Sequence, residues 1–180
     1  MSTGKDFIEQ LKTQFDSSWD MIRQAIMNVP DEKWSTGLIG RGEPWLEPEE
    51  MNIEYYSYVV LHLIESADFY SRDDPNNMKW GSAIGGIDWK NETPQETASR
   101  ISKEAMLDYA KKIESQLTKK LDSLSIEDLL EQDGFSKSYP NRLAKYLSLM
   151  RHTMFHIGEL ARVLRNYGCE RLSWEHQANP

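Results

Sequence analysis

The stretch PNRLAKYLSLMRHTMFHIGELARVLRNYG, residues 140–168, decides the fold that the sequence predicts. Its apolar residues recur every three or four positions, which is the spacing of one face of an α-helix. The two adjacent rows are Leu143, Leu147, Met150, Met154, Ile157, Ala161, Leu164 and Leu149, His152, Thr153, His156, Leu160, Val163. Gly168 is typical of a helix stop. We therefore expect one helix from about Pro140 to Tyr167, with its apolar side in a core.

Three other segments repeat this period and predict further helices. These helices are expected at about residues 6–29, 48–72 and 94–124, with a short capped turn at 125–130 and connectors at 31–47, 73–92 and 132–140. Pro48 is expected to begin the second helix, and Thr93 with Glu96 forms a capping box before the third. No segment predicts strands. The expected fold class is all-α, a four-helix bundle in a single domain over residues 1–180, with 170–180 as a loosely ordered tail.

The composition argues against several classes of function. The chain has 29 acidic and 21 basic side chains and a net charge of −8, which disfavours nucleic acid as a partner, because phosphate binding depends on Lys and Arg. No run of 18 apolar residues occurs, so we expect no membrane partner. The polar N-terminus and the lone Cys169 predict a cytoplasmic protein without a disulfide framework or a cysteine-rich zinc site.

Histidine is the residue type that carries the candidate chemistry. The four histidines are His62, His152, His156 and His176. His152 and His156 stand four positions apart, so they share a helix face and can hold one metal ion between them. His62 also falls on an inward row of its helix, and three core-facing imidazoles from two helices can converge. The spacing alone leaves open that these histidines are packing residues with hydrogen-bond partners in the core.

The motif His152-Thr-Met-Phe-His156-Ile-Gly-Glu159 resembles the C-terminal motif of the DinB-like (YfiT-like) proteins. Those proteins are four-helix bundles with one histidine on the second helix and an HxxxH pair on the last. His62, in VVLHLI (59–64), sits where the first histidine of that family is expected, and the likeness in helix order covers most of the chain. The resemblance implies that His62, His152 and His156 bind zinc, nickel or a similar divalent ion.

Glu159 departs from the family pattern, which often has Gln at this position. It follows His152 by seven residues and so lies on nearly the same line of the helix. It is a candidate for a fourth ligand, a base, or an acceptor that orients a ligand. The plainer interpretation is a surface carboxylate, or one that pairs two helices.

The charge of a three-histidine site decides which chemistry is open to it. Three neutral imidazoles leave the ion at +2 with one open position. Water in that position approaches a pKa of about 7, and a thiol ionises there. The resemblance implies a thiol-dependent S-transferase or isomerase, or a hydrolase. We therefore expect a protein that activates water or a low-molecular-weight thiol against a small-molecule electrophile, with Glu159 as the candidate catalytic residue.

The alternative is a non-catalytic metal-binding or stress-response scaffold, because no clear acid–base group other than Glu159 accompanies the histidines. DNA binding, which the family name suggests, is least favoured because of the net charge. Cys169 lies well over two helical turns past His156, which makes it a poor nucleophile for the site.

Two surface features bear on partners. Residues 142–171 carry six basic and two acidic side chains, a balance that attracts an acidic small molecule or simply forms a solvated helix face. The broad apolar arc of the helix expected at 48–72 fits either a homodimer, as DinB-like proteins often form, or an enlarged core.

Overall fold

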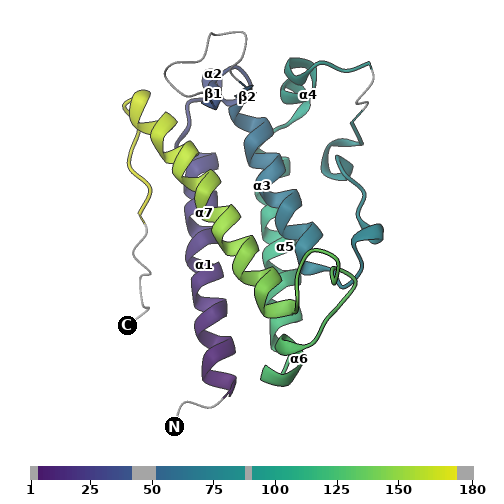
Figure 1. Ribbon diagram of the computed structural model, residues 1–180. Coiled ribbons are helices and arrows are strands. Elements are labelled where there is room, and N and C mark those ends of the chain that lie inside the picture. Colours follow the sequence, from purple (N-terminus) through teal and green to yellow (C-terminus); the bar gives the residue numbers. More distant parts are fainter. Residues whose placement is uncertain (1–3, 42–51, 88–90, 174–180) are drawn as a thin grey trace.

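The computed structural model describes residues 4–41, 52–87 and 91–173, and the chain is mostly helical, as the sequence predicts (Figure 1). The four long helices are α1 (Gly4–Asn28), α3 (Tyr56–Ser71), α5 (Lys103–Asp122) and α7 (Arg142–Asn166). The shorter ones are α2 (Asp31–Trp34), η2 (Pro75–Asn77), η3 (Ser82–Ile84), α4 (Pro94–Arg100) and α6 (Ile126–Leu130).

The long helices stand side by side and close a ring. Helix α1 contacts α5 and α7, and α3 contacts the same two helices, so each long helix packs against two others. The core lies between them and contains the fully buried side chains Ile22, Ile26, Tyr56, Leu61, Leu63, Ile64, Met106, Ile113 and Tyr146. Each buried aliphatic side chain of this size contributes about 1.5–3 kcal/mol of hydrophobic stabilisation. This ring brings α3 against α7, which are far apart in the sequence.

Helix α7 is the predicted helix of residues 140–167, and its ends have clear causes. The side chain of Asn141 accepts a hydrogen bond from the backbone N–H of Ala144, which caps the first turn. Gly168 follows the last turn at φ +71, a left-handed conformation that glycine adopts without strain. The sequence prediction of this helix is therefore confirmed to within about two residues at each end.

The start of the second predicted helix is wrong. Residues Asn52–Tyr55 form strand β2, which pairs antiparallel with β1 (Leu38–Arg41), whereas Pro48 lies outside the described residues. The expectation of no strands is wrong for the same reason. The segment Asn-Ile-Glu-Tyr alternates polar and apolar residues, a strand period that the longer helical pattern obscures. The backbone N–H of Tyr56 then donates to the carbonyl of Gly37, which fixes the start of α3 beside β1.

The third predicted helix is two helices. Its capping box of Thr93 and Glu96 is present and begins α4, but the helix ends at Ile101, whose ψ of 110° is extended. The side chain of Ser102 then accepts from the N–H of Ala105 and caps α5. The indole N–H of Trp34 donates to the carbonyl of Ile101 at 2.6 Å, so the break has a buried hydrogen-bond partner.

Several short elements lie at the two ends of the long helices, whereas the connector that follows α3 runs beside them (Figure 1). The strands β1 and β2 lie with α2 and α4 at one end, and α6 lies at the other (Figure 1). In the three described ranges, no helix combines the length and apolar character needed to cross a bilayer. Residues 174–180 of the predicted tail fall outside those ranges.

Candidate metal centre

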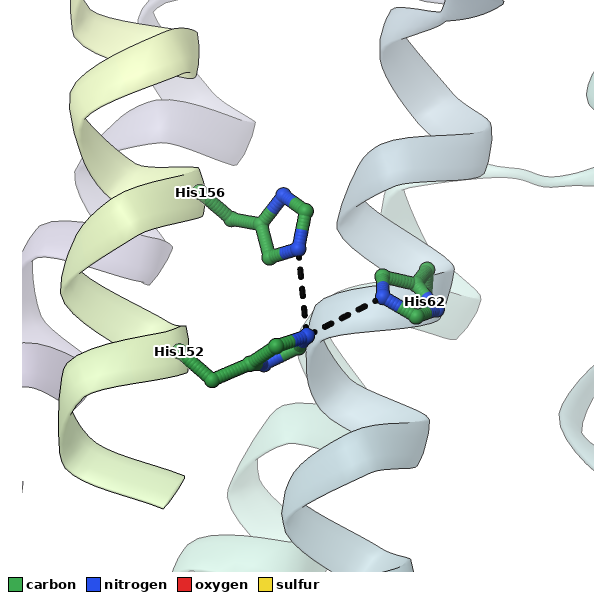
Figure 2. A group of neighbouring side chains, drawn as sticks. All are labelled: His62, His152 and His156. Carbon is green, nitrogen blue, oxygen red and sulfur yellow. Dashed lines mark hydrogen bonds between the residues drawn. The ribbon is translucent and has the colours of Figure 1, made fainter. Parts of the chain in front are cut away.

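Three histidine rings meet between α3 and α7, as Figure 2 shows. His62 comes from the middle of α3, while His152 and His156 come from successive turns of α7. The packing of α3 against α7 closes the distance between these segments. The Nε2 atom of His152 lies 3.2 Å from Nε2 of His62 and 3.2 Å from Nε2 of His156. The structure thus brings together all three residues that the sequence predicts as metal ligands.

The spacing of these nitrogens suits a single divalent ion. One ring nitrogen from each histidine lies within 4.8 Å of the others, so the group could hold a metal ion. Histidine nitrogens bind zinc at about 2.0–2.1 Å, which places two tetrahedral ligand atoms about 3.3 Å apart. The 3.2 Å separations between the Nε2 atoms match that value. Only small ring movements are therefore needed for the histidines to surround an ion.

Hydrogen-bond chemistry within the cluster also favours a shared ion. An imidazole nitrogen carries either one hydrogen or one lone pair in the ring plane. The Nε2 atom of His152 faces the Nε2 atoms of both neighbours at the same distance, so it cannot make two well-directed hydrogen bonds at once. One cation at the centre of the cluster would accept a lone pair from each of the three rings.

Glu159 lies on the outer side of His156. Its Oε2 atom is 2.8 Å from Nδ1 of His156, the ring nitrogen that points away from the cluster. A carboxylate there accepts the Nδ1–H bond, so that the Nε2 lone pair of a neutral ring faces the other histidines. Because His156 is only 2% exposed, this contact fixes the orientation of a buried ring. The geometry matches the sequence interpretation in which Glu159 orients a ligand.

A cavity of about 410 Å³ adjoins the cluster at His152. The residues that line it are Tyr70, Tyr139, Ser148, Arg151, His152 and Phe155. Its size falls in the range of small-molecule sites. The sequence prediction missed this cavity, because Tyr139 lies in a connector whose position is set only by the folded chain.

The two carboxylates that follow His62 on α3 serve other contacts. Glu65 accepts from the backbone N–H of Gly81, and Asp68 accepts from the hydroxyl of Tyr109 and the guanidinium of Arg72. Both carboxylates are 3% exposed. Burial, reinforced by the nearby charge of Asp68, raises the pKa of Glu65 to about 7, although the Gly81 amide acts in the opposite direction. These groups join α3 to the loop after it and to α5.

The remaining sequence candidates lie elsewhere. Cys169 is half-buried, and its backbone N–H bonds the carbonyl of Leu164; it is not a member of the histidine group. His176 is outside the described residues. A larger cavity of about 970 Å³ includes no histidine, and the residues that line it are Gly85, Gly86, Ile87, Asn91, Glu92, Glu96, Ser99 and Arg100. The chemistry of the three imidazoles, and not cavity size, therefore identifies the candidate site.

Comparison with known proteins finds no matching family model, no matching curated protein and no matching solved structure. The assignment of the site therefore depends on its own geometry.

Proposed function

We propose that this protein is a DinB-like four-helix bundle that binds zinc or nickel on His62, His152 and His156 and activates water or a low-molecular-weight thiol against a small electrophile. The observation that supports the proposal is the convergence of three imidazole nitrogens from α3 and α7, two pairs of them 3.2 Å apart. Helix order, with the single histidine on α3 and the pair on α7, also agrees with the resemblance in the sequence.

The residues of the site have separate roles in metal binding, ring orientation and substrate binding. A bound divalent ion supplies Lewis acidity that lowers the pKa of a water or thiol beside it. His62, His152 and His156 would hold the ion as neutral imidazoles, so its positive charge would not be cancelled. Glu159 holds the His156 ring in the required orientation. The cavity beside His152 gives a small molecule a place next to the histidine cluster.

Elemental analysis of the purified, untagged protein tests the metal site. We expect about one zinc or nickel per chain after incubation with the metal and dialysis, and little in the His62→Ala variant. His176→Ala is the matched control, because it removes the histidine that the sequence leaves outside the predicted ligand set of His62, His152 and His156. Full metal content in His62→Ala, or equal loss in both variants, would show that the cluster is not the site.

Activity is tested on protein of known metal content. The loaded and chelated forms are compared for transfer of a small thiol to 1-chloro-2,4-dinitrobenzene and for hydrolysis of 4-nitrophenyl acetate. We expect one of these rates to require the metal and to be lost in His152→Ala. The non-catalytic scaffold would be favoured if the protein bound stoichiometric metal but neither rate depended on it. The spectrum of the cobalt form would then also show no exchangeable ligand.

A further inference from the structure

The cavity at His152 has a polar end and an aromatic rim. Ser148 precedes His152 by one turn of α7, so both side chains lie on the same face of that helix. Tyr139 reaches from the connector before α7, and its hydroxyl lies 3.3 Å from the Tyr70 hydroxyl and 3.2 Å from Ser148 Oγ. Phe155, which is 59% exposed, forms part of the rim. A molecule in this cavity therefore meets hydroxyl groups and the histidine cluster together.

The hydroxyl groups of this cavity are neutral hydrogen-bond donors. Burial, together with the hydrogen bond to Tyr139, raises the pKa of Tyr70 to about 12, so this phenol keeps its proton at neutral pH. Each of these hydroxyls can turn its hydrogen toward an incoming acceptor. They accordingly add no negative charge that would oppose an anion.

Arg151 supplies the positive charge of the cavity. Its guanidinium donates to Ser148 Oγ at 3.3 Å, so the charge lies beside the hydroxyl groups. Among residues 4–41, 52–87 and 91–173, the ion pairs are formed by side chains other than Arg151. Arg142, for example, pairs with Asp133. The remaining donors of Arg151 can therefore form the paired hydrogen bonds that a carboxylate accepts.

We propose that the substrate of this site is a small molecule with a carboxylate group, which Arg151 and the hydroxyls of Tyr139 and Ser148 bind while the reacting atom lies at the histidine cluster. This inference is built on the proposed function, because it names the class of substrate for the same site. A cationic ligand is disfavoured by the guanidinium, and a purely apolar one would leave the hydroxyl groups and the charge without new partners. Arg151 is thus a specificity-determining residue.

Two thiols of equal length test the preference for a carboxylate. Protein loaded with cobalt is titrated with 3-mercaptopropionate and with 3-mercaptopropionamide, and sulfur binding is followed by the sulfur-to-cobalt charge-transfer band. We expect the carboxylate to bind about tenfold more tightly, as one charge-assisted contact would give. Arg151→Gln should reduce this ratio to about one without changing cobalt content. The matched control is Arg165→Gln, which removes the same charge from an exposed position of α7 outside the cavity and should retain the ratio.

A second measurement does not require the metal. In metal-free protein, the Nε–Hε resonance of Arg151, assigned by its loss in Arg151→Gln, should shift with 3-mercaptopropionate and not with the amide. An equal affinity for the two thiols, an unchanged ratio in Arg151→Gln, or an equal loss in Arg165→Gln would overturn the inference. Absence of stoichiometric cobalt would instead refute the metal site, and the Arg151 resonance would then decide the carboxylate preference alone.

Discussion

Replacing Glu65 by glutamine is expected to make the protein less sensitive to rising pH. Glu65 is 3% exposed, and its side chain accepts from the backbone N–H of Gly81. Burial raises its pKa from the usual 4.5 to about 7. Between these two values the folded chain holds a proton that the unfolded chain has lost, so the free energy of unfolding falls as pH rises. Glutamine has no charge to bury, and its amide oxygen can still accept from Gly81.

The size of the effect follows from the two pKa values. Each pH unit between 4.5 and about 7 corresponds to about 1.4 kcal/mol, so complete ionisation of Glu65 costs roughly 3 kcal/mol. Most of this cost appears between about pH 5 and pH 8. Over that interval the free energy of unfolding of the wild type should fall by about 2–3 kcal/mol more than that of Glu65→Gln. The side chain is almost completely buried, so solvent screening reduces this free-energy difference only slightly.

Urea unfolding at the two pH values, followed by circular dichroism with a chelator present, measures this difference. Urea is uncharged, so it does not screen the carboxylate. Glu170→Gln is the matched control, because Glu170 is exposed. Its free energy of unfolding should change between the two pH values by as much as that of the wild type. If Glu65→Gln loses as much stability as wild type between the two pH values, the buried charge is not the cause and the reasoning is wrong.

Three further substitutions test other contacts in the structure. Zinc at about 100 times its dissociation constant should raise the free energy of unfolding of the wild type by about 3 kcal/mol, and His62→Ala should show no increase in a thermal melt. Glu159→Gln should weaken metal binding by about 10- to 100-fold in competition with a chelating dye, because the amide is a poorer acceptor for Nδ1–H of His156; unchanged affinity would mean that the carboxylate does not orient the ring. Asp133→Asn should cost about 3–5 kcal/mol in urea unfolding, since it leaves the fully buried Lys145 ammonium without its carboxylate, and a loss below about 1 kcal/mol would contradict this account of the pair.

The sequence predicts the histidine cluster well because the placement of its members depends on local periodicity. His152 and His156 lie four residues apart on a long, strongly periodic helix, and this spacing fixes their common face before any tertiary contact forms. His62 can be placed on an inward row of its own helix in the same way. The packing of α3 against α7 then needs only to bring two known faces together.

The features that the sequence prediction missed depend on long-range contacts. The break at Ile101 has a partner in Trp34, 67 residues earlier, and strand β2 is a strand because β1 lies beside it. The cavity at His152 likewise needs Tyr139, whose hydroxyl bonds a side chain of α3 across 69 residues. Contacts of this kind form only when the chain has folded, so a local sequence pattern does not predict them.

The separation of His62 and His152 by 90 residues has a consequence for biosynthesis. A ribosome that adds about 5–20 residues per second completes α3 several seconds before α7, so a nascent chain offers an ion only one of the three imidazoles. Full affinity for a metal ion would appear only when α7 has docked, after the entropic cost of closing that long loop has been overcome. Metal capture would therefore be a late event in maturation, and it would select chains that have completed their fold over those that have stalled.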